Sequence, residues 1–272
     1  MKRFSLFLVG LYASVYLLTS CLKGSNVWEG YVVGVLEYSD KNFFQPVLKT
    51  SMGDYYSPSF NNLMSEGQMS MFGCYHVYLQ VDSDTPENAP SIVELNGYQT
   101  VTVHAFQEVP RYSLNYVLTD TSTVLTSEAP LLKGYDAGDY VARHFFAVHQ
   151  MNIQDDSELS WNLSFDNNRM YTEEGGKRYY DLFVRAIVTK EGGKSKTNKS
   201  FMIAYAVGGY MTLAAEQEKA LLGSTYNAST SKFALRFNFV SDINETTKAM
   251  TWGSDQIDAP VAPFLYENQN PY

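Results

Sequence analysis

The chain has 272 residues and a formal net charge of −9, with 20 Lys and Arg against 29 Asp and Glu. Binding to nucleic acid or to an anionic membrane surface depends on clustered cations, so this acidic balance argues against both partners. Aromatic residues make up 15% of the chain and charged residues only 18%, which favours a protein built mainly of β-strands. The length exceeds that of a typical single domain, so we expect two.

The first 20 residues have the composition of an export signal. Lys2 and Arg3 provide the positive start, and residues 4–18 form a mostly apolar run. The run is shorter than the about 20 residues that a transmembrane helix needs and is typical of a signal peptide. We therefore predict a cleaved signal peptide over residues 1–20; an uncleaved N-terminal anchor helix is the alternative.

The signal ends in Leu18-Thr19-Ser20-Cys21, which resembles the lipobox of bacterial lipoproteins. The resemblance implies that the Cys21 thiol is diacylated and that a lipoprotein signal peptidase cleaves before it. Two or three acyl chains, such as palmitate, hold a protein stably, because each buried methylene contributes about 0.8 kcal/mol. We predict lipidation at Cys21 and a tether over residues 21–29; an ordinary signal peptide with an incidental Cys is the other interpretation.

Strand patterns dominate residues 30–110. The clearest is the segment 68–81, in which every second residue contributes to one apolar face. The expected strands include residues 31–38, 44–49, 68–81 and 98–106. About five strands suffice for a small barrel, so we predict a β-barrel domain over residues 30–110.

Residues 110–140 differ in composition from what precedes them. Ser, Thr, Asp and Gly dominate, Pro110 and Pro130 are present, and only residues 113–118 have a strand pattern. Such residues are typical of connecting segments. We predict a linker over residues 111–140.

A second β-rich domain is predicted over residues 141–255. Residues 201–207 are apolar on both faces, which indicates a central strand. The tetrapeptide Glu-Gly-Gly-Lys occurs at 174–177 and again at 191–194, and paired glycines suit tight hairpin turns. The expected strands are residues 143–153, 158–165, 179–190, 197–207 and 232–240.

One helix is predicted, over residues 212–222, with Thr212 as its cap and Gly223 just past its end. The last segment, residues 256–272, contains three prolines. We predict an irregular tail there.

The residues carry no metal or catalytic signature. The four histidines (His76, His104, His144 and His149) form no i, i+2 or i, i+4 pair, so we predict no metal site and no cofactor. Calcium binding by the Asp-rich loops at 82–84 or 155–156 is the alternative.

No Gly-x-Ser-x-Gly, Walker or His-Glu-x-x-His motif occurs, so we predict no catalytic residues and a non-enzymatic protein. A secreted hydrolase built on two carboxylates would leave no local motif and stays an alternative.

Exposed aromatic rings are the remaining candidates for binding. Trp161 lies on an apolar strand face and is expected in the core, whereas Trp252 follows a polar stretch and is the candidate ligand contact. Trp28 is a further candidate. A sugar-binding platform is therefore an alternative function. Cys74 is expected to be a half-buried strand residue, with a disulfide between chains as the alternative.

Several segments together resemble the NigD-like lipoproteins of Bacteroidota. They are the lipobox, Gly67-Gln68 before a long strand, the segment at 116–126, and Leu235-Arg236-Phe237-Asn238 followed by a turn at Asp242. The resemblance implies an N-terminal OB-type barrel followed by a C-terminal immunoglobulin-like β-sandwich, and it assigns no catalytic residues.

These observations predict a lipid-anchored cell-envelope protein of the outer membrane that binds a protein or glycan partner. Many surface lipoproteins of Bacteroidota carry acidic residues directly after the lipidated Cys, whereas Leu22-Lys23-Gly24-Ser25 stands here. The sequence therefore leaves open whether the protein is exposed on the surface or faces the periplasm. A pilus-type structural subunit is a further alternative, which predicts a sheet edge able to accept a donor strand.

Overall fold

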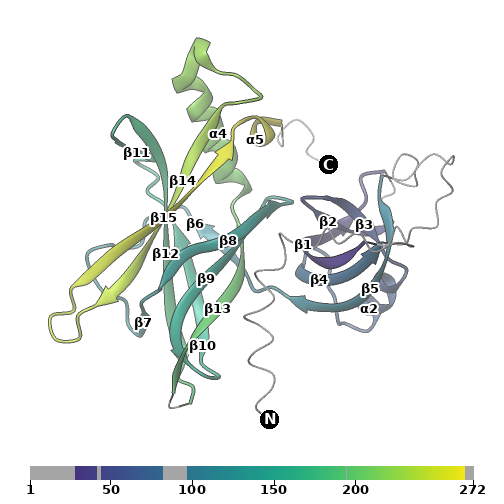
Figure 1. Cartoon of the computed structure of the whole chain (residues 1–272), viewed down its shortest axis with the longest axis horizontal. Coiled ribbons are helices and arrows are strands. Elements are labelled where there is room, and N and C mark those ends of the chain that lie inside the picture. Colours follow the sequence, from purple (N-terminus) through teal and green to yellow (C-terminus); the bar gives the residue numbers. More distant parts are fainter. Residues whose placement is uncertain (1–27, 42–43, 82–96, 194, 267–272) are drawn as a thin grey trace. The chain divides into compact units, whose positions relative to one another are not determined.

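The computed structural model describes residues 28–41, 44–81, 97–193 and 195–266. The predicted signal peptide, Cys21, most of the predicted tether and the Asp-rich loop at 82–84 lie outside the described residues. The chain divides into two compact units, Met1–Glu108 and Val109–Tyr272, which are described separately (Figure 1).

The first unit is a closed five-stranded barrel with the order β1-β2-β3-β5-β4. Neighbouring strands are antiparallel except β3 and β5, which are parallel. This is the strand order of an OB-fold, and it confirms the predicted barrel. The elements are β1 (Glu29–Tyr38), β2 (Pro46–Thr50), β3 (Gly53–Tyr56), α2 (Ser59–Ser65), β4 (Cys74–Val81) and β5 (Gln99–Glu108).

Every second side chain of β4 points into the barrel and fills its interior. Tyr75, Val77 and Leu79 point inward and are at most 1% exposed, as the pattern predicted. The strand begins only at Cys74 rather than at residue 68, because Gly67 and Phe72 both take positive φ angles and turn the chain. β3 and α2 were not predicted, since each is short and buries few residues.

The second unit is one ten-stranded sheet with the order β15-β14-β12-β10-β6-β13-β9-β8 along its main path, and β11 and β7 pair with β12. Pairs β12–β14, β10–β6 and β6–β13 are parallel. The strands are β6 (Arg111–Asn115), β7 (Glu128–Ala129), β8 (Lys133–Val141), β9 (His144–Gln154), β10 (Glu158–Ser164), β11 (Tyr171–Glu174), β12 (Lys177–Lys190), β13 (Lys196–Ala206), β14 (Lys232–Ile243) and β15 (Met250–Pro260).

The sheet folds into two facing halves that β6 joins. Its two ends meet where the Asp255 carboxylate of β15 accepts hydrogen bonds from the backbone N–H groups of Gly134 and Tyr135 in β8, at 2.9 and 3.0 Å. Between the halves, the rings of Phe145 in β9 and Phe237 in β14 stack with centroids 5.2 Å apart. The predicted β-sandwich is thereby confirmed.

The structure differs from the predicted linker over residues 111–140. That segment supplies β6, β7 and β8 to the sandwich. The polar composition misled the prediction because β8 ends the strand path and is largely exposed, while β6 is short and buries only Leu114. Such strands are held by backbone pairing and need few apolar side chains.

The helices also extend beyond the prediction. α4 (Gly208–Leu222) starts four residues before Thr212, whose hydroxyl bonds to the Gly208 carbonyl inside the helix instead of capping it. Gly223 follows with φ +52°, as expected. The short 3₁₀ helix η1 spans Gly223–Thr225. The predicted irregular tail contains the end of β15 and α5 (Ala262–Tyr266), because Phe264 packs into the core.

Candidate functional site

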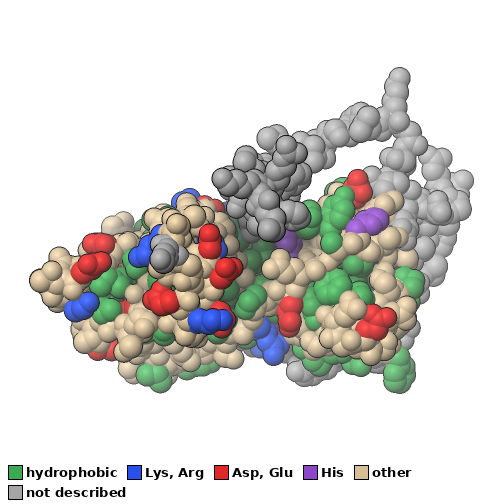
Figure 2. Space-filling view, turned by 90° about the horizontal axis from the view of Figure 1, so that it is seen from below, with side chains coloured by type: hydrophobic (Ala, Val, Ile, Leu, Met, Phe, Trp, Pro, Cys, Tyr) green, Lys and Arg blue, Asp and Glu red, His purple; other side chains and the backbone are tan. Residues whose placement is uncertain are grey.

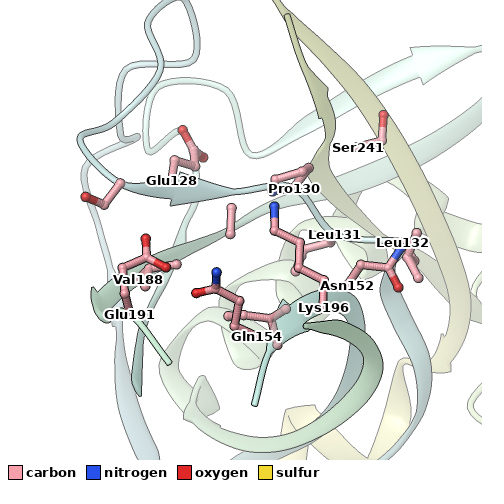
Figure 3. A pocket seen from close by; sticks show the side chains of 13 residues that line it. Glu128, Pro130, Leu131, Leu132, Asn152, Gln154, Val188, Glu191, Lys196 and Ser241 are labelled. Carbon is pink, nitrogen blue, oxygen red and sulfur yellow. The ribbon is translucent and has the colours of Figure 1, made fainter. Parts of the chain in front are cut away.

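A cavity of about 490 Å³ opens between the two halves of the sandwich (Figure 3). A volume of this size falls in the range of small-ligand sites. Its walls come from the segment 127–132, the end of β9, the end of β12, the start of β13, and β14. The lining residues are Ser127, Glu128, Ala129, Pro130, Leu131, Leu132, Asn152, Ile153, Gln154, Val188, Glu191, Lys196 and Ser241.

The segment 127–132 bridges the two halves and forms one wall of the cavity. The Ser127 carbonyl accepts from the backbone N–H of Val188 at 2.9 Å, and the Leu131 N–H donates to Val240 at 2.8 Å. On the opposite side the Leu132 N–H donates to the Gln150 carbonyl at 2.7 Å. Because both halves hold this segment, the cavity is formed before any ligand arrives.

A buried ion pair fixes the chain that leads into this wall. The side chains of Arg185 and Glu128 are both 0% exposed, and the guanidinium donates to both carboxylate oxygens. Arg185 also donates to the backbone carbonyls of Asp120 and Thr123. The Glu128 charge is thus compensated within the protein, although the residue lines the cavity.

Four polar side chains face the cavity without such compensation: Asn152, Gln154, Glu191 and Lys196. Figure 3 shows the Lys196 amine and the Gln154 amide inside the ring of lining side chains. The Gln154 Oε1 atom is buried and has no hydrogen-bond partner within the described residues. Neither Lys196 nor Glu191 forms an ion pair in the described part of the chain. Beside them lies an apolar floor of Leu131, Ile153 and Val188.

This arrangement suits recognition rather than chemistry. A bound molecule would give a hydrogen-bond donor to Gln154 Oε1, an acceptor to Lys196 and an apolar group to the floor. No segment of the sequence signalled it, because the lining residues come from stretches far apart in the chain and none belongs to a recognised ligand-binding motif.

The tryptophans occupy three different environments. Trp161 is in the core as predicted, 5% exposed and stacked on His149 with centroids 4.7 Å apart. Trp252 is half-buried in β15, where its ring packs on Phe183 at 5.7 Å and lies 5.8 Å from the Arg185 guanidinium. It does not line the cavity, so its role as a ligand contact stays a prediction. Trp28 is 40% exposed.

The two histidines of the second unit, His144 and His149, contact different partners. Burial lowers the pKa of His149 to about 4, and its ring contacts the Gly134 carbonyl and the Tyr205 hydroxyl. His144 contacts the Ala142 carbonyl. Among the described residues no group of three or more His, Cys, Asp and Glu side chains is placed to hold a metal ion. In the candidate calcium loop at 155–156, Asp155 pairs with Lys199 instead.

Comparison with known proteins finds a family model that resembles most of the first unit. Residues 24–107 match the lipoprotein OB domain family. The sequence has no significant match among curated proteins. In the described residues no helix is long and apolar enough to cross a membrane.

Solved structures are similar to this chain at low sequence identity. An uncharacterized protein from Parabacteroides merdae is 19% identical with a TM-score of 0.70, covering 85% of this chain and 99% of its own. A putative lipoprotein from Bacteroides fragilis is 12% identical with a TM-score of 0.50, covering 86% and 98%. A NigD-like immunity protein from Bacteroides caccae is 9% identical with a TM-score of 0.42, covering 87% and 99%. The first unit is thus similar to the lipoprotein OB domain family, and the expected resemblance to the NigD-like lipoproteins of Bacteroidota is confirmed.

Proposed function

We propose that this chain is a non-enzymatic binding lipoprotein, anchored to the outer membrane through Cys21, whose sandwich cavity takes a short segment of a protein partner. The lipobox-like end of the leader and the match to a lipoprotein OB domain support the anchor. The wall segment 127–132 is hydrogen-bonded to both halves of the sandwich, and this preformed cavity supports the binding role.

The unsatisfied polar groups of the cavity carry the proposal. A buried acceptor without a partner costs about 1–3 kcal/mol, which a ligand N–H at Gln154 Oε1 would recover. A peptide main chain offers N–H donors for Gln154 and carbonyl or carboxylate acceptors for Lys196. A small apolar side chain of the same segment would cover the floor formed by Leu131, Ile153 and Val188.

The same geometry argues against a hydrolase at this cavity. Glycoside hydrolysis uses two carboxylates on either side of the bond that breaks. Of the two that line the cavity, Glu128 is fully buried and paired with Arg185, which leaves only Glu191 available.

The binding role is tested with the full chain in detergent and a pooled tripeptide library, by ligand-observed NMR. We expect saturation transfer to a subset of peptides. Gln154→Leu and Lys196→Met should each abolish it, while Gln256→Leu, the same exchange at an exposed position of β15, should not. Transfer that survives both cavity substitutions, or no transfer to any peptide, would refute the proposed site.

The anchor has its own test. Cys21→Ala should move the protein from the detergent phase to the aqueous phase and out of the outer-membrane fraction. Unchanged membrane retention would contradict lipidation at Cys21.

A further inference from the structure

The outer face of three barrel strands carries an ordered patch of side chains. β1, β4 and β5 lie side by side, and their register places Tyr31 opposite Tyr78 and Val33 opposite His76. Residues that alternate with these, such as Val77, fill the barrel interior. The patch is therefore built on rigid, fully paired strands.

Four rings of this patch form one continuous row, here called the ring platform (Tyr31, Tyr78, His76 and His104). The Tyr31 ring lies 4.9 Å from that of His76 and 4.8 Å from that of Tyr78, between centroids. The Tyr78 ring lies 5.5 Å from that of His104. Tyr31 is 42% exposed and His104 is exposed, so ring faces remain open to solvent. Figure 2 shows histidine and hydrophobic side chains together on one face of the barrel.

Polar groups along one edge hold the rings in place. The Tyr78 hydroxyl donates to the Glu29 carboxylate, which raises the pKa of Tyr78. His104 Nε2 lies 3.1 Å from Gln80 Oε1, so this nitrogen carries the proton that the amide oxygen accepts. Glu29 and Gln80 are themselves opposite each other in the register, two residues along each strand from the two tyrosines. An edge of fixed carboxylate and amide groups thus borders the ring faces.

The charge of the patch restricts its ligand. Glu29 brings a negative charge, and burial lowers the pKa of His76, which keeps that ring neutral near pH 7. No Lys or Arg contributes to the ring contacts of the platform. A polyanion such as nucleic acid is therefore not attracted to it.

We propose that the ring platform binds a neutral saccharide chain, a second site independent of the sandwich cavity. The apolar C–H face of a sugar stacks on Tyr31, Tyr78 and His104, while its hydroxyls bond to Glu29 and Gln80 at the edge. Aromatic rings offer broad contact at a small entropic cost, with a polar handle at one end. OB-folds commonly use the face around strands 2 and 3 for ligands, whereas this row lies on β1, β4 and β5.

Affinity electrophoresis of the full chain in detergent tests this site, with starch, xylan, mannan or a mixed-linkage glucan cast in the gel and polygalacturonate as an anionic comparison. We expect one or more neutral polysaccharides to retard the protein. Tyr31→Ala should weaken retardation about tenfold, since a well-placed ring contact is worth up to about one factor of ten. Tyr31→Phe, which keeps the ring, should retain most of it.

Tyr38 provides the matched control, because it lies on the same strand, is 44% exposed and makes no ring contact with the platform. Tyr38→Ala should bind as the original chain does, and all variants should keep the same circular dichroism spectrum. The cavity variant Gln154→Leu should also bind unchanged, which separates this site from the proposed peptide site. Retardation by polygalacturonate alone, no retardation at all, or equal losses in Tyr31→Ala and Tyr38→Ala would overturn the inference.

Discussion

The Arg185–Glu128 pair allows a sharp test of how the cavity wall is held. In Arg185→Met the guanidinium is replaced by an apolar side chain that fills much of the same space. Glu128, 0% exposed, would then keep a buried carboxylate with no cation, and the carbonyls of Asp120 and Thr123 would lose their donor. The segment that leads into the wall would lose its attachment to β12.

The expected loss is about 3–5 kcal/mol in the free energy of unfolding, because removing one partner leaves an uncompensated buried charge. Replacing both partners by apolar residues is often nearly neutral. The double variant Arg185→Met/Glu128→Met should therefore recover part of the loss. The rest remains because the carbonyls of Asp120 and Thr123 still lack donors and the Leu125 N–H loses its Glu128 acceptor, and each net hydrogen bond contributes about 1 kcal/mol.

Urea unfolding followed by tryptophan fluorescence measures this. A Trp28→Phe background leaves only Trp161 and Trp252, both in the second unit, so the signal reports on the sandwich alone. A loss below about 1 kcal/mol in the single variant would refute the reasoning. So would a double variant no more stable than the single one.

Two further predictions concern stability. Burial lowers the pKa of His149 in the folded chain to about 4 from its ordinary value of 6.5, so between these values the unfolded chain binds a proton that the folded one does not. Stability should be complete above pH 6.5 and fall by about 3 kcal/mol as the pH drops to 4, and His149→Gln should remove this slope in urea titrations at fixed pH. In the turn between β11 and β12, Gly176 has φ +78°, so Gly176→Ala should cost about 1–2 kcal/mol of unfolding free energy. Gly193, at the same place in the second Glu-Gly-Gly-Lys copy, has no positive φ, so an equal loss in Gly193→Ala would contradict the explanation.

The strands with a clear alternating pattern could be predicted from sequence. β14 was expected as a strand over residues 232–240, and its alternating apolar residues Phe233, Leu235, Phe237 and Phe239 are all buried in the core. The turn at Gly175 and Gly176 was likewise predicted, and both take positive φ. In each case the pattern is local, since neighbours in sequence fix either the face or the turn.

The elements that escaped prediction depend on distant parts of the chain. β8 is largely polar, and its position follows from pairing with β9 and from the Asp255 carboxylate 120 residues away from Tyr135. The ring platform was missed for a related reason. His104 lies in the predicted strand 98–106, but its neighbour Tyr78 comes from another strand, and only the register brings the two together.

The place of β6 has a consequence for how this protein can be divided. Residues 111–115 follow the barrel directly, yet they are inserted between β10 and β13 in parallel with both. A fragment that starts at residue 141 would lack this middle strand and β8, and would so expose unpaired edges of β10, β13 and β9, which invite aggregation. The sandwich can be produced alone only if its chain begins at Val109, so the shortest self-sufficient version includes the stretch that looks, in sequence, like a spacer.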